Sequence, residues 1–266
     1  MATLNLRQWA ENCRLHEPQR SDLLKVVRLG EGDDLKAFAQ VCHDLVLDRP
    51  VSFDLTERIK LYERWLGSEQ PCLLAAHDGA GHVVATSIIL PLTLATFRAF
   101  WLEGLDALQI WPQHLVPPGN TQQHRYFLVD MLARNKQFIK SMQTVDQRAF
   151  CGIGFRAMLY HLSLFYDAGQ AIEPVILCST FNRDLGKLLR TIGFDQRSGQ
   201  GEMVAPIFQA DFSQRNSLSA DAQRLLNACT GVVQHYIQDR PQVQPKPTIG
   251  ASLIKAARDL FRSLKR

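Results

Sequence analysis

Asp130 is the most unusual chemistry-bearing residue of the sequence, because it lies in the middle of the otherwise apolar run Arg125–Ala133. A carboxylate is costly to bury without a partner or a purpose, and a buried carboxylate beside a reacting group can take up its proton. His124 stands at the start of this run, and Glu103 lies in the preceding segment 91–123. These three side chains are therefore the candidate general acids or bases.

Two of these candidates also have a structural interpretation. Asp130 can form a salt bridge with Arg125 or Arg134, and His124 can be a solvated loop histidine. Other chemistries find no support, since the sequence contains no CxxC pair, no H-E-x-x-H pair and no G-x-S-x-G turn. We therefore expect neither a metal site nor a serine nucleophile.

A glycine-rich turn is the second chemical feature. Residues 152–157 (GIGFRA) match the pattern G-x-G-x-x-A and open a run with helical periodicity. A dinucleotide fingerprint needs a hydrophobic strand directly before it, and residues 144–149 (TVDQRA) are too polar for one. Backbone N–H groups at such a turn still favour a phosphate, and the helix dipole adds to this. The alternative is a flexible turn before a core helix.

A third feature lies further along the chain. Asn182 follows the strand-like run Val175–Cys178, and Gly193-Phe194 stand eleven and twelve residues later, beyond a short predicted helix. With the glycine turn, this order resembles the GCN5-related N-acetyltransferase (GNAT) superfamily, as a divergent member. In that family a strand, a pyrophosphate loop, a helix, a strand and N-x(10)-G-F form the acyl-CoA half. The resemblance covers about residues 24–208.

The resemblance implies a fold, a co-substrate and a binding site. The fold would be α+β, with a central, mostly antiparallel twisted sheet flanked by helices and a helical C-terminal extension. Acetyl-CoA or another acyl-CoA, or an acyl-carrier thioester, would be the co-substrate. The glycine turn would hold the pyrophosphate, and one strand edge would bind the pantetheine as an added strand. The residues that bind the co-substrate would be Leu132, Ala133, Arg148, Gly152, Ile153, Gly154, Phe155 and Asn182.

The sequence departs from the family pattern in three ways. Ala149 occupies the usual basic position of the loop, with Arg148 one residue upstream, and residues 134–146 separate the strand from the turn. Leu189 stands where the family commonly has a tyrosine that protonates the leaving thiolate. Because leucine cannot donate a proton, either another group is the acid or the activity has been lost.

Two functions follow from this pattern. The first is an acyltransferase that moves an acyl group from the thioester to an amine or hydroxyl of an unknown acceptor, with Glu103 in the wall of the acceptor site. The alternative is a catalytically degenerate GNAT-fold module that binds a protein partner or an anionic membrane surface.

Apolar periodicity predicts the elements that position these residues. Helices are expected at 35–46, 55–66, near 102–110, and at 154–168, 184–191 and 220–238. Strands are expected at 24–29, 72–76, 83–90, 125–133 and 175–178, and from Phe194 onward. Ser219 is a predicted N-cap and Gly193 a predicted C-cap.

Composition and charge limit the remaining possibilities. The chain has 266 residues, of which 46% are hydrophobic and 21% charged, as is usual for a globular protein. The formal net charge of +4 comes from residues 249–266, which hold five cations and one anion. Because the rest of the chain is neutral, nucleic-acid binding is not expected.

The sequence also predicts a domain organisation and a location. Residues 249–266 have one apolar and one basic helical face, which is typical of a helix on an anionic membrane or a partner protein. The alternative is that this helix folds back on its own domain. Well-separated cysteines and the lack of an apolar leader predict a cytoplasmic protein. If the basic helix binds a membrane, the protein would be peripheral at that membrane's surface. The predicted parts are a GNAT-like domain at 1–210 with an insertion near 91–123, a helical extension at 211–239, a proline-spaced linker at 240–248 and the basic helix at 249–266.

Overall fold

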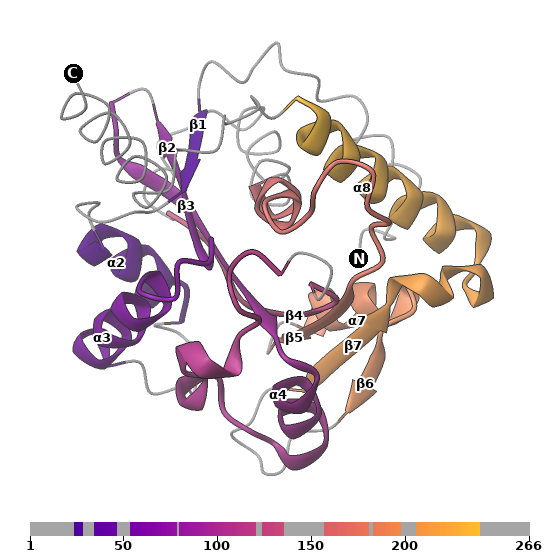
Figure 1. The fold of residues 1–266 in the computed structure, drawn as a ribbon, viewed down its shortest axis with the longest axis horizontal. Helices are drawn as coiled ribbons and strands as arrows, with labels where there is room; N and C mark the ends of the chain where they lie inside the picture. The colour runs from indigo at the N-terminus through magenta and orange to yellow at the C-terminus, as the bar shows by residue number, and fades with distance from the viewer. Residues whose placement is uncertain are drawn as a thin grey trace, which may run out of the picture.

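A mostly antiparallel sheet forms the middle of the molecule (Figure 1). The computed structural model describes residues 24–28, 35–46, 54–78, 80–120, 124–135, 157–180, 183–197 and 206–239. The described residues form seven strands in the order β1-β2-β3-β4-β5-β7-β6. All neighbouring pairs are antiparallel except β4 and β5, which are parallel. The strands are β1 (Leu24–Arg28), β2 (Leu73–Asp78), β3 (Val83–Leu92), β4 (Tyr126–Arg134), β5 (Val175–Ser179), β6 (Asp195–Arg197) and β7 (Ile207–Asp211).

Helices cover both faces of this sheet, so the core has two halves. The first face packs Phe38, Tyr62 and Trp65 against the sheet, and the second packs Phe165 and Phe208. The described helices of the first face are α2 (Leu35–Val46), α3 (Leu55–Leu66) and α4 (Leu94–Arg98). Those of the second are residues 157–163, α7 (Arg183–Thr191) and α8 (Ala220–Gln238). The predicted α+β class with flanking helices is confirmed.

Local signals determine where several helices begin and end. α3 begins at Asp54, whose side chain accepts a hydrogen bond from the Glu57 N–H at 3.0 Å. α8 begins at the predicted N-cap Ser219, whose hydroxyl accepts from the Ala222 N–H at 3.3 Å. Gly193 follows α7 with φ +90°, a conformation that glycine adopts without strain. These termini agree with the sequence-based predictions.

Three predictions about elements need correction. The helix expected near 102–110 lies earlier, as α4 and the π-helical turn η2 (Ala99–Glu103), because Gly104 adopts φ +75° and ends it. Two short 3-10 turns follow, η3 (Ala107–Gln109) and η4 (Pro112–His114). The helix expected to reach residue 168 ends at 163, where i→i+3 turns replace it. Strand β7, which the sequence analysis did not predict, lies between β5 and β6.

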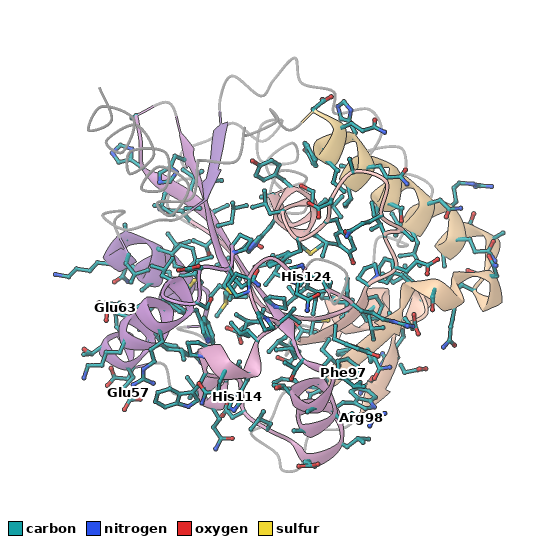
Figure 2. The ribbon with its side chains drawn as sticks, viewed as in Figure 1. Glu57, Glu63, Phe97, Arg98, His114 and His124 are labelled. Atoms are coloured by element: carbon teal, nitrogen blue, oxygen red, sulfur yellow. The ribbon has the colours of Figure 1, made fainter. Side chains whose placement is uncertain are left out.

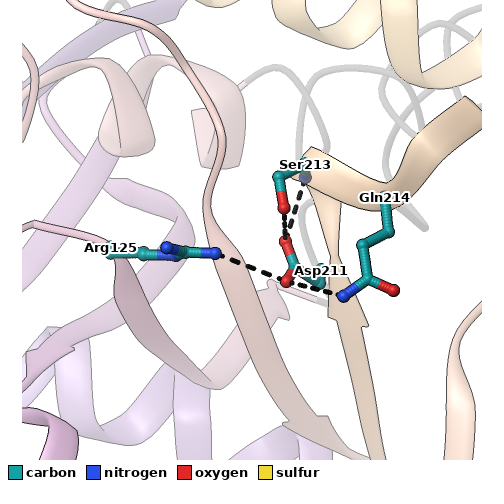
Figure 3. A network of polar contacts seen from close by, with 4 residues as sticks. All are labelled: Arg125, Asp211, Ser213 and Gln214. Atoms are coloured by element: carbon teal, nitrogen blue, oxygen red, sulfur yellow. Dashed lines mark hydrogen bonds and ion pairs between the residues drawn. The ribbon is translucent and has the colours of Figure 1, made fainter.

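A polar network joins the start of β4 to the end of β7 (Figure 3). Asp211 Oδ1 accepts hydrogen bonds from the Ser213 N–H at 3.0 Å and hydroxyl at 2.6 Å. Asp211 Oδ2 lies 3.5 Å from Arg125 Nη2 and accepts from the Gln214 amide at 3.3 Å. Burial alone would raise the pKa of Asp211, but the Ser213 hydrogen bonds, the Arg125 charge and the Gln214 amide together hold it below its usual range.

Asp211→Asn should therefore destabilise the protein by about 1 kcal/mol near neutral pH, a modest value because Arg125 is half exposed. The folded-state pKa lies below the unfolded value of about 3.9. The advantage of the wild type is thus complete above that value and decreases as the pH falls through the folded-state pKa. Urea unfolding between pH 6 and pH 3 measures the difference. A difference that stays constant over this range would contradict the assignment.

Candidate active site

Strands β4 and β5 pair over only part of their length. Tyr126–Val129 pair in parallel with Val175–Cys178, whereas β4 stays paired with β3 up to its last residue. On the β5 side, residues 130–134 have no strand partner among the described residues. An unpaired strand edge presents backbone N–H and C=O groups that an extended ligand can bind. Leu132 and Ala133, two predicted co-substrate residues, lie in this stretch.

Asp130 occupies a β-bulge at the point where the two strands part. Ile88 pairs with Met131 and Ile89 with Val129, so Asp130 is an extra residue without an opposite partner. The bulge interrupts the alternation of side chains along β4. Asp130 contacts α3, and Met131 packs into the core on the same face of the sheet. Leu132 follows and remains 38% exposed, which is unusual for a leucine within a central strand.

The ion-pair partner of Asp130 is Arg58 of α3. Arg58 Nη1 lies 3.9 Å from Asp130 Oδ2, and each side chain is only 12% exposed. Burial raises the pKa of Asp130, the Arg58 charge opposes this rise, and the Asp106 charge adds to it, so that the pKa lies above its ordinary value. A salt bridge with a cation such as Arg125 or Arg134 was the structural alternative. Arg125 pairs with Asp211, and the side chain of Arg134 is outside the described part of the structure. The structure thus gives Asp130 a charged partner that the sequence analysis did not identify.

Several polar residues missed by sequence reasoning surround this pair. Cys42 and Tyr62 belong to apolar helical stripes, yet both lie in the polar cluster that contains Asp130. Cys42 Sγ lies 3.3 Å from the Thr86 hydroxyl. Burial raises the pKa of Cys42 to about 12, so that it is a neutral thiol. In the sequence, both residues have the same helical spacing as the apolar core residues, so the spacing alone did not indicate polar neighbours.

His124 does not meet Asp130. It precedes β4, so that about 20 Å of extended chain separates the two residues. His124, labelled near the middle of the view in Figure 2, is buried rather than solvated. Its Nδ1 donates to the Phe165 carbonyl at 2.9 Å, and its Nε2 lies 3.5 Å from the Gln70 amide nitrogen. Burial lowers the pKa of His124, so it is a neutral ring that ties the start of β4 to a turn.

The other predicted site residues fall into two groups. Glu103 is exposed at the end of η2, in the segment held against α3 by the Trp65 indole, which donates to the Ile110 carbonyl at 2.9 Å. Leu189 is buried in the core of the second face. Arg148, Gly152, Ile153, Gly154, Phe155 and Asn182 lie outside the described residues.

The described residues contain neither a candidate metal site nor a helix that could span a membrane. No group of three or more His, Cys, Asp or Glu side chains there is arranged to hold a metal ion. No helix in that part of the chain is long and apolar enough to cross a membrane. Cys178 lies at the parting of β4 and β5, but burial raises its pKa to about 12 and leaves it a poor nucleophile.

Solved structures similar to this chain include GNAT acetyltransferases. One, from Staphylococcus aureus Mu50, is 9% identical, with a TM-score of 0.43 over 71% of this chain and 99% of its own. The Naa20 structure from Chaetomium thermophilum, in complex with a bisubstrate analogue, is 12% identical, with a TM-score of 0.35 over 74% and 93%. The C-terminal condensation domain of Ebony, in complex with beta-alanyl-dopamine, is 10% identical, with a TM-score of 0.41 over 71% and 98%.

These similarities are remote. No protein-family model matches the chain, and no curated protein matches it by sequence. The solved structures are too distant from this chain for an argument from their similarity. At this identity they carry neither an activity nor a substrate over to this chain.

Arg58→Met tests the buried ion pair, because it keeps the aliphatic stem and removes the charge. The pKa of Asp130 should rise further, since burial would then be less opposed. With a folded-state pKa above the unfolded value of about 3.9, the variant should lose stability as the pH rises through the folded-state value. Removing one partner of a buried pair costs about 3–5 kcal/mol when both groups are charged.

Urea unfolding at pH 4.5 and pH 8 measures this loss, which should be larger at pH 8. Adding Asp130→Asn to the variant should restore most of the stability, because the uncompensated charge is then gone. If Arg58→Met is as stable as the wild type at pH 8, the two side chains do not form a functional ion pair.

Proposed function

We propose that this protein is an acyltransferase that moves an acyl group from acyl-CoA, or an acyl-carrier thioester, to an amine or hydroxyl of its acceptor. The observation that carries the proposal is the parting of β4 and β5 at Asp130. There, a strand edge with no partner in the described part of the chain and a buried carboxylate of raised pKa occur within a few residues of each other.

The thioester donor would bind along β4. Pantetheine is an extended chain with two amides, and it can form backbone hydrogen bonds to residues 130–134 on the side that β5 leaves. The exposed side chain of Leu132 offers this chain an apolar contact. The glycine turn at 152–155, with Arg148, would hold the pyrophosphate, and Asn182 would line the thioester end.

Asp130 would be the general base. The acceptor nitrogen or oxygen attacks the thioester carbonyl carbon, a new C–N or C–O bond forms, and the C–S bond breaks. The acceptor proton passes to Asp130, directly or through water, and then to solvent. A pKa above the ordinary carboxyl value makes Asp130 a stronger base than an exposed aspartate.

The leaving thiolate would not need a protein acid. Leu189 is buried and has no proton to give. A thiol has a pKa of about 8.5, so a thiolate is a tolerable leaving group near neutral pH and takes its proton from water. Most of the rate enhancement would then come from holding the acceptor and the thioester close together in the reactive orientation. Proton transfer would be a second contribution.

Buried Leu189 also favours a second candidate, a catalytically degenerate module. In that case the fold would serve binding alone, to a protein or to an anionic membrane through residues 249–266, which lie outside the described residues. Binding of acyl-CoA followed by release of the CoA thiol distinguishes the two candidates, because only the acyltransferase requires it.

Asp130→Asn should lower turnover by about 100-fold or more, because a general base contributes about 10²–10⁴ to a rate. Affinity for acetyl-CoA should stay nearly unchanged. Thiol release from acetyl-CoA with a panel of primary amines gives the turnover, and calorimetry gives the affinity. Asp221→Asn, at an exposed position on α8, is the matched control and should change neither value. Normal turnover in Asp130→Asn, or failure of that variant to fold, would instead assign Asp130 a purely structural role.

A further inference from the structure

A pair of buried polar side chains joins the second face of the sheet to a helix that covers it. The helix consists of residues 157–163, and His161 contacts β3 from it. His161 is completely buried, and its Nδ1 lies 2.9 Å from the hydroxyl oxygen of Ser87, which is also buried. The ring of His161 also stacks on Phe165, with 5.7 Å between the ring centroids. The proposed reaction uses neither polar residue.

The two ring nitrogens of His161 contact two different parts of the sheet. Nε2 lies against the carbonyl oxygen of Pro71, just before β2. Because a carbonyl can only accept, Nε2 carries the proton, and in the neutral ring Nδ1 then accepts a hydrogen bond from the Ser87 hydroxyl. Apolar packing has no preferred direction, whereas two hydrogen bonds from one ring specify a single position. His161 therefore fixes the helix both to β3 and to the residues before β2.

The turn that follows this helix is held at the same place. The Phe165 carbonyl, two residues beyond the helix, accepts a hydrogen bond from His124 Nδ1 at 2.9 Å. His124 Nε2 lies 3.5 Å from the side-chain amide nitrogen of Gln70, the residue before Pro71. Residues 70–71 thus anchor both the helix, through His161, and the turn after it.

This anchoring places the helix beside the proposed thioester edge of β4. Ser87 pairs with Leu132 across β3 and β4, so the two side chains are neighbours on one face of the sheet. His161 contacts Ser87, whereas Leu132 remains 38% exposed. The glycine turn at 152–155, which would hold the pyrophosphate, lies just before the helix in the sequence. The position of the helix therefore affects how the two proposed parts of the CoA site are spaced.

We propose that His161 is a positioning residue for acyl-CoA. Its two hydrogen bonds fix residues 157–163 relative to β4, so that one CoA molecule reaches both the strand edge at 130–134 and the glycine turn. The inference rests on the proposed function, which assigns the pantetheine to the edge and the pyrophosphate to the turn. A thioester donor without a pyrophosphate does not need this alignment.

Ser87→Ala tests the proposal, because it removes one of the two hydrogen bonds and leaves the His161 ring in place. Thiol release gives kcat/KM for acetyl-CoA and for S-acetylpantetheine, which has the same thioester but no pyrophosphate. The value for acetyl-CoA should fall about tenfold through a higher KM, with kcat unchanged. The value for S-acetylpantetheine should stay that of the wild type. His161→Phe, which keeps an aromatic ring and loses both hydrogen bonds, should enlarge the loss for acetyl-CoA.

Thr96→Val is the matched control. It also removes a buried hydroxyl, which donates to the His114 carbonyl at 3.0 Å, but Thr96 belongs to α4 on the other face. The ratio of the two kcat/KM values should stay that of the wild type. If Ser87→Ala loses activity equally with both donors, or loses none, His161 only stabilises the fold and the inference is overturned. Failure of both Ser87→Ala and His161→Phe to fold would overturn it as well.

The wild type separates this inference from the proposed function. If the wild type releases thiol from neither donor, the proposed function is overturned, and the inference with it. If the wild type uses both donors and Ser87→Ala changes them alike, only the inference is overturned.

Discussion

Strand β4 keeps its antiparallel partner along its whole length and loses its parallel partner after Val129 and Cys178. The extra residue at Asp130 marks that point, and a bulge bends a strand and increases its twist. Two consequences follow together. Beyond the bulge, the side of β4 that faces β5 has no strand partner among the described residues. The carboxylate points toward the helices of the first face. The proposed site therefore depends on one irregularity of the sheet, the β-bulge at Asp130.

That irregularity determines what the helices must supply. A carboxylate among the buried residues of the first face is costly unless a cation opposes it, and Arg58 of α3 does so. The same helix carries Tyr62 and Trp65, and Trp65 holds the segment after η3 through the Ile110 carbonyl. Its outer side carries Glu57 and Glu63 (Figure 2). Helix α3 thus links the charge of Asp130 to the segment in which the acceptor side of the site was predicted.

Local patterns were sufficient to predict α2, α3, α8 and β4 from the sequence. Each depends on periodicity or on a cap within a few residues, such as Ser219 before α8. The bulge and the Arg58–Asp130 pair depend on strand register and on a contact between residues far apart in the chain, which one sequence does not specify. Strand β7 was missed because its five residues alternate half-buried and buried positions without a strong apolar run. The polar neighbours of Tyr62 could not be predicted, because an aromatic residue at helical spacing indicates packing in the core.

Hydrogen exchange of the backbone amides at residues 130–134, with and without acetyl-CoA, shows whether the thioester binds along this edge of β4. Exchange there should slow on binding, because the pantetheine would pair with the strand edge beyond the end of the β5 pairing. Amides of β2, which is paired on both sides, should not change. Gly154→Glu, which places a carboxylate where a phosphate should approach, should abolish the effect. Binding of acetyl-CoA without slower exchange at 130–134, or no binding at all, would contradict the account.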